Sequence, residues 1–160
     1  GYDLKNKKVV ILGAGGAAKA ITFALASRDL EIIILNRSVK KAENLAKQVA
    51  GLGGKASFGI LARGSWLKEV DLLIQTTPVG MNGEDFLFDL QGIKYGSLAI
   101  DLIYNPYITS FLAQAQSYGC KTMNGLEMLL YQGILAWKYW FAIEAPVEIM
   151  RRSITVLYEG

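Results

Sequence analysis

A glycine-rich turn between a short apolar strand and a helix-forming stretch constrains the fold of this 160-residue chain more than any other feature. Lys8 to Leu12 is typical of a buried strand, Gly13-Ala14-Gly15-Gly16 of a tight turn, and Ala17 to Ser27 of a helix. The first and third residues of the turn, with Ala18, match a G-x-G-x-x-A pattern. Such a turn presents free N–H groups and the positive end of a helix dipole to an anion.

The rest of the chain continues the alternation of apolar strands and helices. Further strands are predicted at 31–35, 55–58, 71–75, 97–101 and 121–123, and helices at 39–49, 110–117, 126–143 and 146–157, with a short helical or loop segment at 65–68. Strands that read as continuous apolar runs indicate a parallel sheet covered on both faces. We therefore predict one α/β domain over residues 1–160, a Rossmann-type doubly wound parallel sheet in three layers, α/β/α.

Composition excludes several classes of function. The net charge is only +3 and no long basic run is present, so nucleic acid is not an expected partner. One cysteine, Cys120, and no histidine exclude a disulfide framework, a Cys/His metal site and a Ser-His-Asp triad, and a single thiol fits a reducing cytoplasm. The apolar run 126–143 could span a bilayer, but its interior Glu127, Gln132 and Lys138 favour a largely buried helix.

The end of the second predicted strand indicates which cofactor the glycine turn would bind. Sites for NAD usually carry Asp or Glu there, about twenty residues after the glycines, whereas this strand ends in Leu35-Asn36-Arg37-Ser38. Glu31 stands at the opposite end of the strand. Arg37 offers a planar fork of donors to a 2′-phosphate, and Ser38, Lys40 and Lys41 add a hydroxyl and positive charge. NADP is favoured, although Ser38 could simply cap a helix and the lysines form a solvated face.

Over nearly its whole length the chain resembles the cofactor domain of the shikimate dehydrogenase family. The resemblance is carried by five motifs in order, at 13–20, 36–38, 76–81, 101–106 and 125–132. It implies reversible reduction of 3-dehydroshikimate to shikimate with NADPH, in the biosynthesis of chorismate and aromatic amino acids. One departure is Gln75, where the family more often has Asn.

The resemblance implies a ligand for each motif. The pyrophosphate would lie against Gly13, Ala14, Gly15, Gly16 and Ala17, and the adenosine ribose with its 2′-phosphate against Asn36, Arg37, Ser38 and Lys41. The adenosine side would be lined by Thr76, Thr77, Pro78 and Val79, and the nicotinamide flanked by Leu102 and Gly125. Shikimate would be held in part by Tyr104 and Gln132. From the residues alone, Pro78 reads equally as a turn residue, Tyr104 as a half-buried aromatic and Gln132 as a surface amide.

Family members carry a catalytic Lys and Asp pair in an N-terminal substrate-binding domain, which this sequence does not resemble. Because the chain starts Gly1-Tyr2-Asp3 without an initiator Met, we expect it to be part of a longer protein. Alone it would hold no catalytic residue and turn over no shikimate, and its last helix would face the substrate domain or a second copy in a homodimer. Three alternatives stay open: a quinate dehydrogenase, a non-catalytic NADP-binding module, or another NADP enzyme such as a methylenetetrahydrofolate dehydrogenase.

Overall fold

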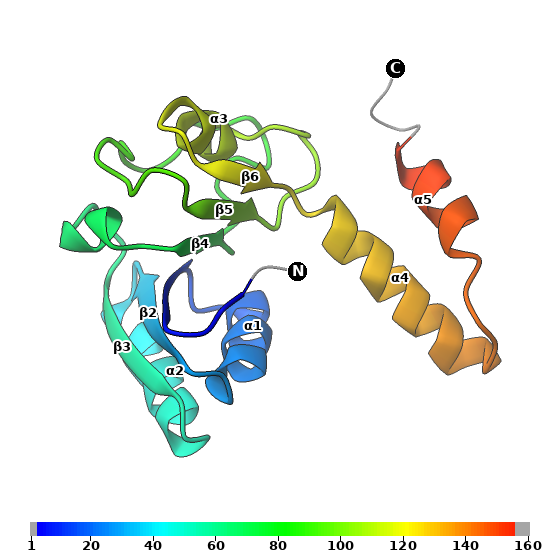
Figure 1. Ribbon diagram of the computed structural model, residues 1–160, viewed down its shortest axis with the longest axis horizontal. Coiled ribbons are helices and arrows are strands. Elements are labelled where there is room, and N and C mark those ends of the chain that lie inside the picture. The colour runs from blue at the N-terminus through cyan, green and yellow to red at the C-terminus, as the bar shows by residue number, and fades with distance from the viewer. Residues whose placement is uncertain (1–2, 156–160) are drawn as a thin grey trace.

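The computed structural model describes residues 3–155, and their centre is a parallel sheet of six strands (Figure 1). The strands are β1 (Lys7–Leu12), β2 (Leu30–Asn36), β3 (Lys55–Ile60), β4 (Leu72–Gln75), β5 (Leu98–Asp101) and β6 (Lys121–Met123). They lie in the order β3-β2-β1-β4-β5-β6, so the direction of winding reverses between β1 and β4. The predicted doubly wound parallel sheet is confirmed.

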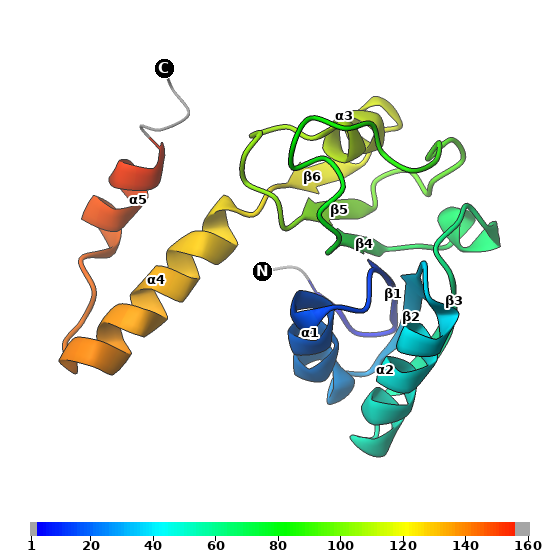
Figure 2. The ribbon, with the colours of Figure 1, turned by 180° about the vertical axis from the view of Figure 1, so that it is seen from behind.

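Helices cover the two faces of this sheet and complete two separate cores (Figures 1 and 2). Val9 and Ile11 of β1 pack toward α1 (Gly16–Ala26) and α2 (Val39–Gly51), in a core that Ala18 and Leu45 complete. The neighbouring Val10 and Leu12 point to the opposite face, where they join residues of the 3-10 helix η1 (Ser65–Lys68) and of α3 (Ser110–Ser117). Strand residues buried on both sides explain why the strands read as uninterrupted apolar runs.

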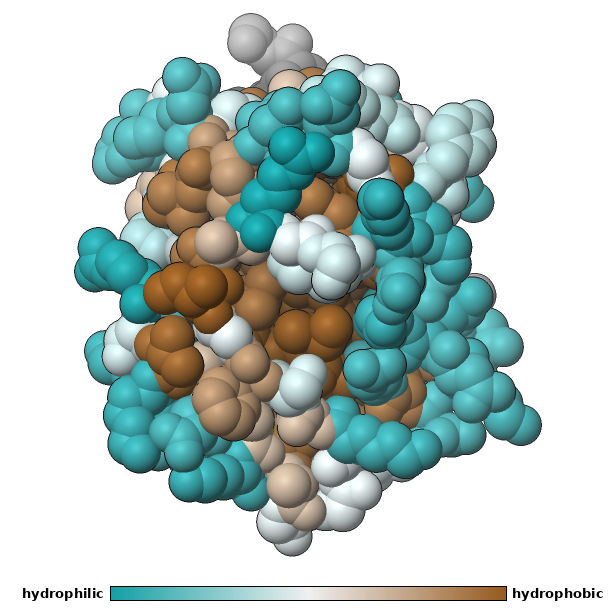
Figure 3. Space-filling view, turned by 90° about the vertical axis from the view of Figure 1, so that its left-hand side faces the viewer, coloured by the Kyte–Doolittle hydropathy of each residue, from teal (hydrophilic) through white to brown (hydrophobic). Residues whose placement is uncertain are grey.

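Parallel pairing brings the carboxyl ends of the strands to one edge of the sheet. β1 pairs with β2 and β4 in register through Leu12, and β4 pairs with β5 through Gln75 and Asp101. Open α/β sheets bind ligands outside this edge, at the point where the winding reverses. β3 is an edge strand: among the described residues it pairs with β2 on one side and with no strand on the other. Its Phe58 and Ile60 are exposed, and Figure 3 shows apolar surface framed by hydrophilic side chains on this side of the molecule.

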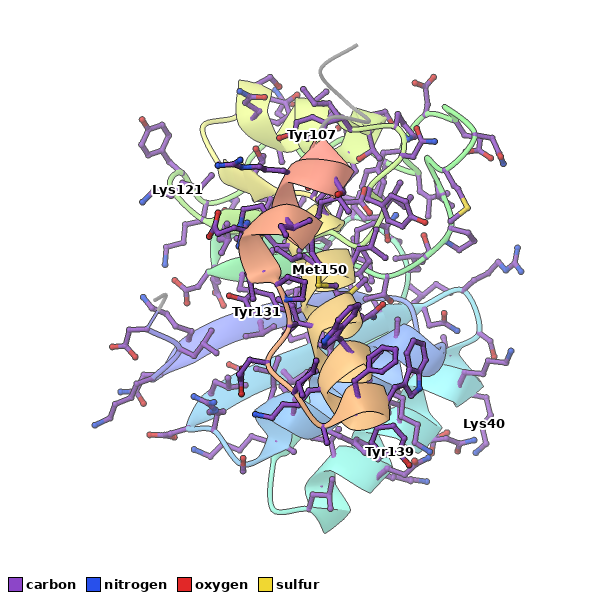
Figure 4. All side chains as sticks on the ribbon, turned by 90° about the vertical axis from the view of Figure 1, so that its right-hand side faces the viewer. Lys40, Tyr107, Lys121, Tyr131, Tyr139 and Met150 are labelled. Carbon is purple, nitrogen blue, oxygen red and sulfur yellow. The ribbon has the colours of Figure 1, made fainter. Side chains whose placement is uncertain are left out.

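The last two helices, α4 (Leu126–Phe141) and α5 (Val147–Thr155), extend away from the sheet and pack on each other (Figures 1 and 2). The prediction of a largely buried helix at 126–143 is wrong, because Leu130 is the one buried residue of α4 and the exposed fractions of Tyr139 and Trp140 are 87% and 71%. Figure 4 faces these helices, with Tyr139 near the C-terminal end of α4, and Met150 of α5 lies against Gly133 of α4, where a Cβ would stand 2.9 Å from its methyl carbon. The predicted end of the last helix, at 156–157, lies outside the described residues. Within residues 3–155, no helix combines the length and apolarity that crossing a bilayer requires.

Candidate functional site

The glycine turn leaves its backbone open toward solvent. Gly13 is buried with a φ of 117°, and a side chain there would collide with the Thr76 hydroxyl, so only glycine fits. A Cβ on Gly15 or Gly16 would meet no atom within 4 Å. Ala18 of α1 is fully buried in the core between this helix and the sheet. Gly13 is therefore needed by the fold, whereas the second and third glycines leave a space that the described protein does not fill.

The start of α1 is also free of competing groups. Gly15 forms no side-chain cap, the first turn holds no acidic residue, and the Lys19 N–H donates to the Gly15 carbonyl at 2.9 Å. The N–H groups of Gly16, Ala17 and Ala18 precede that bond and have no intrahelical acceptor. An anion placed here would meet N–H donors and the positive end of the helix dipole.

The residues after β4 hydrogen-bond to the end of β1, directly before the glycine turn. The Thr76 hydroxyl donates to the Leu12 carbonyl at 2.7 Å, and the Thr76 N–H donates to the same oxygen at 2.9 Å. Gln75 is fully buried; its side-chain oxygen accepts from the Thr77 N–H at 3.2 Å and its amide nitrogen donates to the Val79 carbonyl at 3.4 Å. Gln75, the departure from the family pattern, thus braces the 76–79 loop from inside. Pro78 is exposed at its tip.

The end of β2 lies beside the glycine turn, because the Gly13 N–H donates to the Leu35 carbonyl at 2.7 Å. The Asn36 side chain donates to the Ser38 carbonyl at 3.0 Å, and Arg37 projects from the resulting bend as an exposed side chain. Ser38 is the N-cap residue of α2, as predicted, but its hydroxyl makes no cap hydrogen bond and is free for another acceptor or donor. Glu31 lies at the amino end of β2, where it pairs with Lys8 at 3.6 Å.

The two lysines at the start of α2 differ in their electrostatic surroundings. Lys40 pairs with Glu43 at 3.0 Å, and Glu43 also pairs with Lys47 at 2.7 Å. Hydrogen bonds from Lys47 and then Lys40 hold the pKa of Glu43 below its ordinary value. Among the described ion pairs none includes Arg37 or Lys41. These two side chains, rather than Lys40, carry the positive charge available to a phosphate.

On the other side of the reversal point, the segments after β5 and β6 are in close contact. The Leu102 N–H donates to the Gln75 carbonyl at 3.1 Å, and the Gly125 N–H donates to the Ile103 carbonyl at 3.0 Å. A Cβ on Gly125 would collide with the Leu102 carbonyl oxygen, so glycine is required at the start of α4. The structure thus brings Leu102 and Gly125 together, as the predicted nicotinamide site needs.

Two residues that the sequence analysis left without a role organise the segment after β5. Asp101 is fully buried at the end of its strand; its carboxylate accepts from the Ile103 N–H at 3.1 Å and from the Thr109 hydroxyl at 2.6 Å. Burial raises the pKa of Asp101, and the Thr109 and Ile103 hydrogen bonds oppose that rise. A carboxylate as the last residue of an otherwise apolar strand was the available sequence signal.

Tyr104 and Gln132 are both exposed, Tyr104 with an exposed fraction of 41%. Tyr104 comes from the segment after β5 and Gln132 from α4. The hydrogen bond from the Gly125 N–H to the Ile103 carbonyl joins that segment to the start of α4. A cavity of about 570 Å³ lies between β6, α3 and α5, and none of the predicted site residues lines it. The Glu127–Arg151 ion pair forms part of its wall. Within residues 3–155, no group of three Asp, Glu or Cys side chains is placed to hold a metal ion.

Two family profiles match the chain. The profile described as shikimate/quinate 5-dehydrogenase matches residues 1–79, and the one described as shikimate 5′-dehydrogenase C-terminal domain matches residues 125–155. A shikimate dehydrogenase (NADP(+)) of Desulfitobacterium hafniense is 45% identical over 148 residues, which is 92% of this chain and 54% of that protein. The chain thus spans about half the length of the curated relatives it matches.

Two solved structures extend the comparison to three dimensions. A shikimate dehydrogenase in complex with NADP+ is 40% identical with a TM-score of 0.83, covering 97% of this chain and 56% of that one. The ligand-free 5-ketofructose reductase of Gluconobacter sp. strain CHM43 is 32% identical with a TM-score of 0.80, covering 96% of this chain and 57% of that one. The same fold is therefore present in an enzyme named for shikimate and in one named for 5-ketofructose.

Proposed function

The chain belongs to the shikimate/quinate 5-dehydrogenase family, and we propose that it is the NADP-binding domain, residues 1–160, of a shikimate dehydrogenase. The whole enzyme would reduce 3-dehydroshikimate reversibly to shikimate. A hydride from NADPH would reach the carbonyl carbon and a proton the carbonyl oxygen, which leaves NADP+ and an alcohol. Hydride transfer is the chemistry that the cofactor supplies, whereas the protein binds, orients and manages protons.

The observation that carries this proposal is the open glycine backbone at the start of α1, next to a strand end without a carboxylate. Gly15 and Gly16 border free space, and the helix start offers N–H donors to a pyrophosphate. Arg37 and Lys41 stand one strand away with charges available for a 2′-phosphate. A carboxylate in place of Arg37 would repel that phosphate and favour NAD.

The carboxyl ends of the strands divide the remaining tasks. The segment after β4, braced by Gln75, would line the adenosine side, and Leu102 with Gly125 would hold the nicotinamide ring. Tyr104 and Gln132 would contact shikimate from this domain. We place the proton-transferring Lys and Asp of the family in the portion of the relatives that this chain does not span, so the chain alone should not turn over substrate.

The apolar surface of α4 and α5 would meet that other portion of the enzyme, or a second copy in a homodimer. Tyr139 and Trp140 are exposed on α4, and Ile149 on α5. Several large apolar side chains exposed on the same pair of helices are typical of an interface. We also place the enzyme in the cytoplasm, where Cys120, a buried thiol outside any disulfide, would stay reduced.

Calorimetric titration of the chain with NADP+ and with NAD+ tests the cofactor assignment. We expect NADP+ to bind more tightly, because only its 2′-phosphate can use Arg37 and Lys41. Equal affinities for the two nucleotides would contradict the assignment and favour a quinate enzyme that uses NAD.

The substrate is tested in the full-length protein. Shikimate, quinate and reduced 5-ketofructose are assayed in parallel, because a 5-ketofructose reductase shares this cofactor-domain fold. Tyr104→Phe and Gln132→Ala should raise the KM for shikimate or lower turnover. Unchanged kinetics in both variants would remove these residues from the substrate site.

A further inference from the structure

Asp101 is an ionisable side chain that the proposed function does not use, although its burial is complete. No ion pair among those of the described residues includes it. A carboxyl group removed from water at the end of a strand is costly unless hydrogen bonds compensate. An amide or an apolar residue would avoid that cost, so the contacts of the carboxylate need an explanation.

Those contacts join the two ends of one loop. Oδ1 of Asp101 accepts from the Ile103 N–H at 3.1 Å, two residues along the chain, and Oδ2 accepts from the Thr109 hydroxyl at 2.6 Å, eight residues along. The same hydroxyl accepts from the Leu112 N–H at 3.3 Å and so caps α3. One carboxylate therefore fixes where the 102–109 loop leaves the strand and where it enters the helix.

The loop is also confined by its neighbours in the sheet. Its first N–H, on Leu102, is bonded to the Gln75 carbonyl, and the Ile103 carbonyl accepts from Gly125. Thr109 lies against Gly80, where a Cβ would stand 3.4 Å from the Thr109 Cβ. Leu102, which precedes the bonded Ile103, and Tyr104, which follows it, are thereby held at the edge where the nicotinamide and the substrate are proposed to lie.

We propose that Asp101 is a positioning residue, which sets the place of the 102–109 loop against the nicotinamide half of the cofactor and the reacting ketone. This inference rests on the proposed function. Asp101 touches neither ligand and acts through Leu102 and Tyr104. The phosphate contacts of the adenosine half, at the turn after β1 and the end of β2, do not depend on it.

Asp101→Asn tests the role with two ligands on the wild-type and variant chains. NADP+ carries a nicotinamide, whereas adenosine 2′,5′-bisphosphate carries only the adenosine half and its 2′-phosphate. We expect the dissociation constant of NADP+ to rise on the order of tenfold in the variant, while that of the bisphosphate stays unchanged. A general loss of stability would not separate the two ligands.

Asp89→Asn is a matched control. The Asp89 carboxylate also accepts from one backbone N–H, that of Gln91 at 2.9 Å, and one hydroxyl, that of Tyr118 at 2.8 Å, but it is exposed at the C-terminal end of α3. That end lies away from the strand ends that form the site. Both ligands should bind this variant like the wild type.

The outcomes separate this inference from the proposed function. Equal effects of Asp101→Asn on both ligands, or no effect, would overturn the inference, as would a wild-type chain that binds NADP+ no better than the bisphosphate. A wild-type chain that binds neither ligand would instead overturn the proposed function. Thr109→Val is measured in parallel and should give the Asp101→Asn pattern, so a poorly folded Asp101→Asn protein leaves the inference testable.

Discussion

At the scale of single residues, charge alone does not tell which side chains are available to a ligand. Arg37 and Lys40 are both exposed near the end of β2, but Lys40 already pairs with Glu43 at 3.0 Å. The sequence predicted the cluster and singled out Arg37, because an arginine at the end of the second strand is a local signal. It could not predict the pairing of Lys40, since a lysine on a helix surface can turn toward a neighbouring carboxylate such as Glu43 or toward a bound phosphate.

We expect Arg37→Ala to weaken NADP+ binding by about 1.5–3 kcal/mol, the scale of a hydrogen bond to a charged group. NAD+ binding should stay the same, because NAD+ has no 2′-phosphate. Isothermal titration calorimetry gives both affinities. Lys40→Ala is the control and should cost less than Arg37→Ala. An equal loss in the two variants would mean that the phosphate is held by diffuse charge rather than by Arg37.

Glu84 provides a prediction on pH. Its carboxylate accepts from the Asn82 side chain at 2.9 Å and from the Asn82 and Gly80 N–H groups, each at 3.0 Å, and these bonds lower its pKa to about 2. Because the pKa is lower in the folded chain, the Glu84 carboxylate contributes its full stabilisation at pH values above the ordinary pKa of a glutamate. That contribution is lost as the pH falls toward 2. NMR titration of the side-chain carboxyl measures it.

Asn82→Ala removes the largest cause of that shift, the side-chain hydrogen bond, and should raise the Glu84 pKa toward its ordinary value. A Glu84 titration in the ordinary range in the wild-type chain would show that the loop after β4 is not held in this way in solution.

At the scale of elements, the strand–turn–helix unit formed by β1, the glycines and α1 contains glycines of two kinds. Gly13 needs its positive φ and lies against Thr76, whereas Gly15, with a φ of −88°, borders open space. The sequence predicted the unit because its strand, turn and helix signals are local. Which glycine serves the fold and which serves a ligand depends on the contact with Thr76, which follows β4 far along the chain.

The two glycines should therefore respond differently to substitution by alanine. Gly13→Ala should lower the free energy of unfolding by about 1–3 kcal/mol, the cost of a strained backbone conformation. Gly15→Ala should leave unfolding nearly unchanged but weaken NADP+ binding by about 1.5–3 kcal/mol, because its methyl group blocks hydrogen bonds to a charged phosphate. Chemical denaturation and calorimetry separate the effects. A destabilised Gly15→Ala chain with full NADP+ affinity would reverse the assignment.

Element boundaries and internal contacts differ in how far they follow from sequence. The strands and helices agree closely with the predicted ranges, since apolar periodicity and glycine positions are read locally. The Asp101–Thr109 bond was not predictable, because it needs the fold of the intervening loop. The apolar content of α4 was visible, but whether that content is buried depends on a partner that periodicity does not identify.

At the scale of the whole molecule, the exposed apolar surface of α4 and α5 dominates the expected behaviour in solution. Leu135 and Trp140 of α4 have exposed fractions of 67% and 71%, and Figures 1 and 2 show this helix and α5 side by side at the periphery. Water disfavours apolar surface of this kind, so isolated chains should associate through it.

We expect the sedimentation coefficient of the chain to rise with concentration, and the double substitution Leu135→Glu and Trp140→Glu to suppress that rise without changing NADP+ affinity. Phe58→Glu, on the β3 edge, is the control for an exposed apolar residue elsewhere. Association that persists in the double variant and disappears in Phe58→Glu would place the contact on the sheet edge instead.

The reversal of strand order between β1 and β4 also divides the chain into two successive blocks with separate duties. In the proposed function, residues up to β3 would meet the pyrophosphate and the 2′-phosphate, the segment after β4 would complete the adenosine side, and residues from the end of β5 onward would meet the ring that exchanges hydride and the ketone. The two blocks meet along the β1–β4 pairing, from Val9–Leu72 to Leu12–Gln75, and share both cores, whereas the residues proposed to contact ligands stand at the strand ends, outside that seam. Cofactor preference and substrate preference can thus evolve as independent traits within one sheet.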